Sequence, residues 1–189
     1  MDLFELKGPQ GKDNQPGLLS DIMVAAMQDF KTIKGVKKTT GRGDSVTIDG
    51  SHVFNDDKGF FKCYTTLKTA QLKLGNTGDR DGRGKKIDFT FFHPGNSKEV
   101  AEFDRQIKNQ EAILLVQTPE KVWLQLGSEG LGVEILGEFD SGTLDSGRRG
   151  FTFKVEGYAN GLLFYEGDIQ MADGSLRKAD GTVVAAPGV

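Results

Sequence analysis

The sequence predicts a mainly β protein, an antiparallel β-sandwich or partial barrel with one flanking α-helix at about residues 96–108. Short apolar or alternating segments recur along the chain between turn signals, which is typical of consecutive antiparallel strands. Glycine is abundant, with 26 residues against 5 prolines and no collagen-like period, and this indicates many turns and loops. Residues 111–157 carry the clearest strand signal and contain no catalytic motif.

The expected strands follow from alternation and from β-branched or aromatic composition. The segment 20–33 is ambiguous between helix and strand, and its alternating apolar residues favour a strand at 22–27. In 46–54 the alternation breaks near Gly50, which indicates a bulge or turn. Strands are expected over residues 22–27, 46–54, 60–74, 87–91, 112–116, 122–126, 133–139 and 151–155.

The predicted helix begins after the strand-ending residues 93–95. Asn96 is the expected cap, and Glu99 follows three residues later in the spacing of a capping box. Val100, Phe103 and Ile107 form one apolar stripe at helical spacing, so we expect this stripe to pack against the sheet.

The chain is most simply one domain over residues 1–166, with long polar loops at 34–45 and 75–86. After residue 166 the apolar patterning fades, so residues 167–189 are expected to form an extended or flexible C-terminal tail.

Composition and charge limit the classes of function. The net charge of −3 argues against a general binder of nucleic acid or anionic membranes. Residues 1–95 carry 15 basic and 12 acidic side chains, whereas residues 96–189 carry 9 and 15. Such oppositely charged halves favour head-to-tail contact between copies, although chance scatter produces the same asymmetry.

Cys63 is the only cysteine, which excludes an internal disulfide and favours a reducing compartment. The first residues lack the pattern of a secretory signal, and no apolar run approaches the ~20 residues that span a bilayer. A soluble protein made in a cytoplasm is therefore expected.

No motif for catalysis, a cofactor or a metal is satisfied. Asp79 and Lys86 stand where a phosphate-binding loop needs glycine and serine or threonine, and Thr90 stands where a calcium loop needs glutamate. With one cysteine beside His52 and His93, no Cys/His metal cluster can form. An enzyme is the least expected class, and no catalytic, cofactor-binding or metal residue is assigned.

One strand has a one-sided acidic face. Between Gly127 and Gly147 the chain has acidic residues and no lysine or arginine, and Glu134, Glu138 and Asp140 alternate with apolar residues. This face is either a solvated surface over a buried one or, in an assembly with a lumen, a wall that repels DNA.

The two polar loops are basic and are candidates for contacts between subunits. They are either simply solvated, or they contact phosphate or an acidic face of a neighbouring copy. Their candidate residues are Lys37, Lys38 and Arg42 in the first loop, and Arg80, Arg83, Lys85 and Lys86 in the second.

Residues 96–157 contain a hydrophobic strand that ends in a turn, a "WL-G-E-GL" strand, an "SGT" loop and a final "G-F-F" strand. These features lie at residues 113–116, Trp123 and Leu124, Gly127, residues 129–131, residues 141–143 and residues 150–153. In this order they resemble tail-tube and other virion structural proteins of phages that infect Bacteroidetes-type bacteria. The match before residue 96 is one of pattern only.

This resemblance implies a structural subunit of the virion. Tail-tube subunits are β-sandwiches with a flanking helix that close into hexameric rings, and the rings stack into a channel for DNA delivery. The implied partners are copies of the chain, other tail proteins and transient DNA, with no membrane and no cofactor. The alternatives are a tail terminator, neck or decoration protein, or a ligand-binding β-sandwich with a stacking platform of Trp123, Tyr158, Phe164 and Tyr165.

Overall fold

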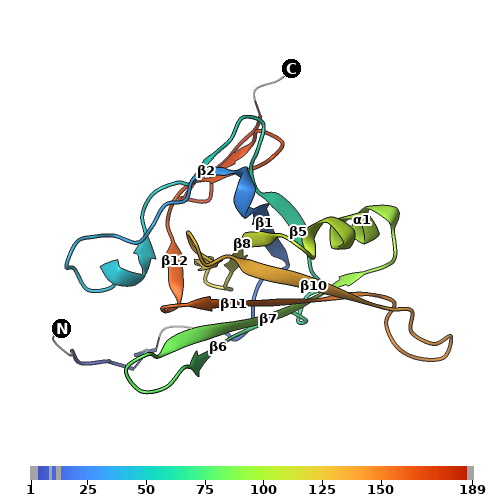
Figure 1. Ribbon diagram of the computed structural model, residues 1–189, viewed down its shortest axis with the longest axis horizontal. Coiled ribbons are helices and arrows are strands. Elements are labelled where there is room, and N and C mark those ends of the chain that lie inside the picture. The colour runs from blue at the N-terminus through green and yellow to red at the C-terminus, as the bar shows by residue number, and fades with distance from the viewer. Residues whose placement is uncertain (1–3, 9, 12–13, 187–189) are drawn as a thin grey trace.

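The protein is mainly β, with antiparallel-rich sheets and one α-helix among the described residues, as predicted. The structure is a computed structural model that describes residues 4–8, 10–11 and 14–186. Ten strands belong to one sheet, which folds into two layers (Figure 1).

The two layers meet at a short corner. The first layer has the order β6 (Gln71–Thr77), β7 (Gly84–Pro94), β11 (Gly150–Ala159) and β10 (Val133–Asp140). The second has the order β5 (Phe61–Tyr64), β1 (Asp21–Ala26), β8 (Glu111–Gln117), β9 (Trp123–Leu126), β12 (Leu163–Tyr165) and β3 (Thr47–Ile48). The layers are joined where β10 pairs with β8 through two residues, Val133 with Ala112 and Glu134 with Glu111.

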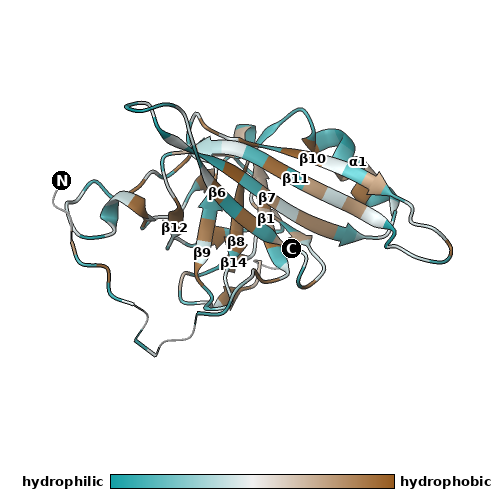
Figure 2. Cartoon of the chain, turned by 90° about the horizontal axis from the view of Figure 1, so that it is seen from below, coloured by the Kyte–Doolittle hydropathy of each residue, from teal (hydrophilic) through white to brown (hydrophobic). Residues whose placement is uncertain are grey.

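Strand β8 is buried on both faces, which explains its continuous apolar sequence. Leu114 and Val24 of the adjacent strand β1 face the first core, between the two layers. Leu115 and Met23 face a second core on the other side. Along β11 and β7 the hydropathy instead alternates, because only one face of the first layer is covered (Figure 2).

Helix α1 (Lys98–Ile107) closes one end of the first core. Its cap is Ser97, whose hydroxyl accepts the Val100 N–H at 3.4 Å, so the predicted cap at Asn96 was one residue early. Val100 and Ile107 are buried, and the Phe103 ring meets the edge of Phe153 at 5.6 Å between centroids. The predicted stripe therefore packs against the sheet.

Two predicted strands are each divided in the structure. In 46–54, the 3-10 turn Asp44–Val46 leads into β3, which pairs with β12 of the large sheet. The chain then enters a second, two-stranded sheet, in which β4 (Val53–Phe54) pairs with β2 (Phe30–Thr32). Strand β2 itself follows the 3-10 turn Met27–Asp29. The segment 60–74 divides into β5 and β6, in opposite layers. The turn between them closes through a Thr69 N–H to Thr66 carbonyl bond of 3.2 Å, with Lys68 at a φ of 68°.

The segment 167–189, expected to be an extended or flexible tail, contains short paired strands among its described residues. Strands β13 (Ile169–Gln170), β14 (Leu176–Arg177) and β15 (Val183–Val184) form a small antiparallel sheet. Ile169 and Met171 are buried in the second core, and Met171 pairs with Phe60 in a β-bridge. Residues 169–171 thus complete the domain rather than trail from it.

Candidate functional site

Strand β10 exposes its acidic side chains on the outer face of the first layer. Glu134, Glu138 and Asp140 are exposed, whereas Val133 and Ile135 on the opposite face are fully buried. Exposed Leu136 lies between the two glutamates, so the outer edge of this strand is acidic but also partly apolar.

The outer face beside β10 carries both signs of charge. The strand register places Glu134 between Glu111 of β8 and Glu156 of β11. Two lysines offset Glu156: Lys154 Nζ lies 2.6 Å and Lys86 Nζ 3.6 Å from its carboxylate. The hydrogen bond from Lys154 lowers the pKa of Glu156 and raises that of Lys154. The unbalanced acidic surface is therefore narrow and follows β10.

Asp140 has a structural task that alternation did not predict. Its Oδ1 accepts the Gly142 N–H at 2.8 Å, where the chain leaves β10. This bond fixes the first turn of the loop that joins β10 to β11. Glu134 and Glu138, the other two predicted acids, make no side-chain hydrogen bond or ion pair with the described residues.

The first basic loop is partly neutralised by its own chain. Lys37 Nζ lies 3.6 Å from Glu166 and 3.9 Å from Asp49. The Arg42 guanidinium lies over the ring of Phe4, 5.0 Å from its centroid. Lys38 is exposed. Lys38 and Arg42 are therefore the charges of this loop most available to a partner.

The second basic loop is shorter than predicted. Strand β6 continues to Thr77 and β7 begins at Gly84, so Arg80 and Arg83 lie in the loop whereas Lys85 and Lys86 lie in β7. The Lys85 ammonium donates to Asn76 Oδ1 at 2.5 Å, across the hairpin. The polar sequence suggested a loop, but the two lysines form part of a paired strand. Both basic loops lie at the end of the molecule away from the β10–β11 loop (Figures 1 and 2).

The aromatic residues considered for a ligand platform do not come together. Phe164 packs against the first core, whereas Trp123 and Tyr165 belong to the second. Tyr158 is exposed on β11. The four side chains occupy three different surroundings, which removes the basis for one stacking platform.

His52 is the centre of a buried polar network in the second core. Its Nδ1 accepts the Lys34 N–H at 3.0 Å, so Nε2 carries the proton and donates to Gln125 Oε1 at 2.9 Å. Gln125 donates in turn to the Gly127 carbonyl at 3.0 Å. Burial lowers the pKa of His52, although the Gln125 bond opposes this shift. The network holds the first basic loop against β9.

Cys63 and His93 lie in environments that suit a structural role. Burial raises the pKa of the Cys63 thiol to about 12, which keeps it protonated and unreactive. His93 Nδ1 lies 2.9 Å from the Tyr64 carbonyl. Within the described part of the chain, no group of three or more His, Cys, Asp or Glu side chains is arranged to hold a metal ion. The described helices include none long and apolar enough to cross a membrane.

Two surfaces that the structure makes prominent were not predicted as candidate sites from the sequence. One is the β10–β11 loop, where Leu144 is fully exposed. The other is a groove of about 1210 Å³ between β6 and β9. A lone leucine within a polar loop was the available signal for the first surface, and the groove depends on long-range packing.

No known family model matches this chain, and neither a curated protein nor a solved structure shows significant similarity to it.

Proposed function

We propose that this chain is a non-enzymatic structural subunit that assembles with copies of itself, as a subunit of a ring-stacked phage tail tube. In this proposal the protein is made in the cytoplasm of a bacterial host and joins other tail proteins in the virion, where the channel passes DNA. The family resemblance of residues 96–157 motivates the specific role.

The observation that carries the proposal is a sheet whose outermost strands among the described residues, β3, β5 and β6, each pair with one neighbouring strand. In the described part of the chain, β6 pairs with β7 alone and β5 pairs with β1 alone. A free edge presents unpaired N–H and C=O groups, which another chain can satisfy. Phe61 and Tyr64 of β5 are also exposed, at 56% and 47%, so pairing at this edge would cover aromatic surface.

The distribution of charge supports contacts between unlike surfaces. The loops that carry Lys38, Arg42, Arg80 and Arg83 lie at one end of the molecule, and strand β10 leads toward the other (Figure 1). Opposite charge guides one copy onto the next and disfavours contact between like ends. The narrow acidic strip of Glu134 and Glu138 would suit a surface along which DNA passes without binding.

Negative-stain electron microscopy and light scattering of the purified protein test this proposal. We expect rings or stacked tubes at high protein concentration, and dissociation in high salt because charge contributes to the contacts. Single rings that never stack would instead favour a terminator or neck protein. Monodisperse monomer at every concentration would contradict a tube subunit.

A further inference from the structure

The β10–β11 loop, residues 141–149, is an ordered projection. The Thr143 N–H and hydroxyl both donate to the Ser146 carbonyl, at 2.9 and 2.8 Å, and the Ser146 N–H donates back to Thr143 Oγ1 at 3.1 Å. These bonds form a tight turn whose two central residues are Leu144 and Asp145. The turn therefore holds a leucine and a carboxylate within the loop, which projects from the end of the first layer (Figure 1).

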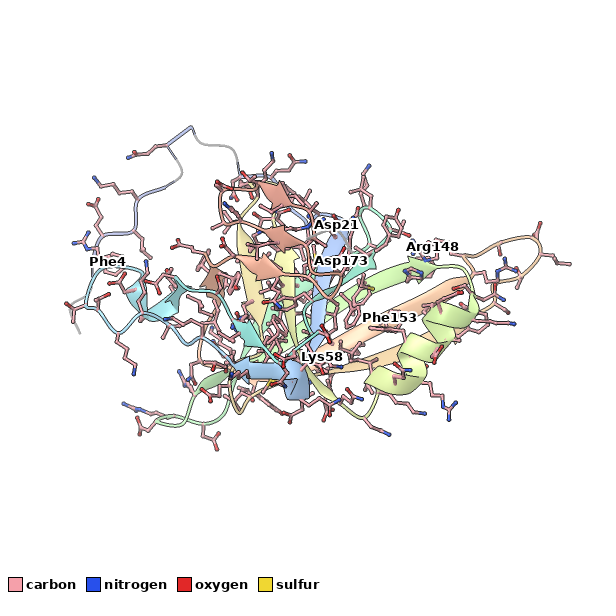
Figure 3. All side chains as sticks on the ribbon, turned by 90° about the horizontal axis from the view of Figure 1, so that it is seen from above. Phe4, Asp21, Lys58, Arg148, Phe153 and Asp173 are labelled. Carbon is pink, nitrogen blue, oxygen red and sulfur yellow. The ribbon has the colours of Figure 1, made fainter. Side chains whose placement is uncertain are left out.

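The base of this loop is braced against the sheet. The Arg148 guanidinium lies over the Phe92 ring at 4.6 Å, and the Gly95 N–H donates to the Arg149 carbonyl at 3.0 Å. Figure 3 shows Arg148 at the opposite end of the molecule from Phe4. A loop that is already ordered loses little conformational entropy on binding, which favours its use as a contact.

Leu144 is exposed on all sides, and no contact of the monomer covers it. An exposed leucine alone needs no explanation. Here, however, a hydrogen-bonded turn presents it at the most distant point of an ordered loop. That geometry is the one in which a side chain can enter a cavity of a partner.

The groove between β6 and β9 has matching chemistry. Its volume is about 1210 Å³, and one wall is the segment 15–19. Leucine is the most frequent residue of its lining, which also includes glutamines and threonines; the leucines are Leu18, Leu19, Leu67, Leu72, Leu74, Leu124 and Leu162. Lys68 is the one charged side chain among the described residues of the lining. The loop offers a leucine beside an acid, and the groove offers leucines beside a lysine.

The loop cannot fill the groove of its own chain. Strand β10 lies three strands from β6 in the first layer, a separation of about 14 Å. The loop also projects beyond the end of that layer (Figure 2), whereas residues of β6 and β9 line the groove. A β10–β11 loop that fills the groove must therefore come from another copy of the chain.

We propose that the groove of one copy receives the β10–β11 loop of a second copy, with Leu144 among the leucines and Asp145 paired with Lys68. This inference deepens the proposed function and rests on it for the biological role of the contact. Because the loop and the groove lie apart on the monomer, a one-way contact between them is head-to-tail and generates a ring or a filament.

Sedimentation velocity of the full chain over a range of concentrations tests the contact. We expect Leu144→Arg to weaken self-association about 10- to 100-fold, because it removes one buried leucine and introduces a charge. Leu131→Arg is the matched control, since Leu131 is also exposed, at 42%, but lies outside both surfaces. The control is expected to associate as the unmodified protein does.

Exchange of the two charges tests the pairing directly. Asp145→Lys and Lys68→Asp should each weaken association, and the double variant should recover most of the loss because the opposite signs face each other again. Circular dichroism confirms the fold of each variant. Lys68, Leu131, Leu144 and Asp145 are all exposed, so each variant is expected to fold as the unmodified protein does.

The outcomes separate this inference from the proposed function. If the protein forms rings or tubes and Leu144→Arg forms them equally well, or if Leu131→Arg abolishes association equally, the loop-and-groove contact is refuted and the tube proposal stands. If association depends on Leu144 and Asp145 but yields only open chains, the contact stands and the tube proposal fails. A chain that never associates refutes both.

Discussion

Replacing Phe153 by alanine should destabilise the protein more than most single substitutions, because Phe153 joins the helix to the first layer. Its side chain is fully buried. Figure 3 shows Phe153 beside the helix. Its ring stacks with Phe91 at 5.1 Å and Phe151 at 5.8 Å, and it makes a T-shaped contact with Phe103 of α1 at 5.6 Å, all between ring centroids. Removal of the ring therefore leaves a cavity and breaks three aromatic contacts.

The expected loss of unfolding free energy is about 3–5 kcal/mol. Each of the three aromatic contacts contributes about 0.5–1.5 kcal/mol beyond the burial of area, which favours the upper part of this range. With a urea dependence of about 2 kcal/mol per molar, the unfolding midpoint should fall by about 1.5–2.5 M.

Urea unfolding, followed by the fluorescence of Trp123 at a concentration that keeps the protein monomeric, measures this loss. Phe61→Ala is the matched control because the Phe61 side chain is 56% exposed, and it should change the free energy by less than about 1 kcal/mol. A midpoint that falls by less than about 0.5 M in Phe153→Ala, or equal losses in the two variants, would refute the assigned packing. A double-mutant cycle with Phe103→Ala should give a coupling of about 0.5–1.5 kcal/mol.

Three further predictions concern other parts of the molecule. The folded-state pKa of His52 is lowered, so its stabilising contribution is complete above about pH 6.5 and is lost as the pH falls toward the folded pKa. In His52→Gln the urea midpoint of unfolding should therefore depend less on pH between pH 8 and 5. Gly59→Ala would place a methyl group against the backbone after β13, so it should lower the unfolding free energy by about 1–3 kcal/mol and expose the C-terminal sheet to proteolysis. Gly82 has open space around it, so Gly82→Ala should change neither the stability nor the proteolysis. If the chain forms the proposed tubes, lysines at Glu134 and Glu138 should leave them intact but slow the release of DNA; loss of assembly in microscopy would instead place β10 in an interface.

The sequence predicted best those elements whose burial pattern is simple, with either one face or both faces packed against a core. The stripe of α1 and the alternation of Val133 and Ile135 arise because each element buries one side against the first core. The run in β8 lacks alternation because cores lie on both of its faces. In these segments, local periodicity records the tertiary surroundings.

The elements that the sequence missed depend on partners far along the chain. The break between β5 and β6 has no glycine or proline, and it occurs at Lys68 with a positive φ. The C-terminal strands have two residues each, which is too short for a periodic signal. Their position depends on the bridge between Met171 and Phe60, more than a hundred residues apart in sequence.

The candidate site shows the same limit. Alternation predicted that Glu134, Glu138 and Asp140 would share a face. It could not predict that Lys154 of β11 and Lys86 of β7 would both lie beside Glu156 of β11. The register between β11 and β7 brings those lysines together, and this register depends on the packing of both strands. Strand β10 is therefore the acidic element of the outer face, within a surface of mixed charge.

Stacked rings need one contact around the ring and another between rings, and the free surfaces of this chain can supply both without competition. The β10–β11 loop closes its hydrogen bonds within its own turn, so its docking in the groove would leave the outer edge of β6 free to pair. The groove contact depends on leucines and one ion pair, whereas an edge contact depends on backbone hydrogen bonds. Leu144→Arg should therefore remove one kind of contact and leave the other, and its assembly products should reveal which of the two closes the ring.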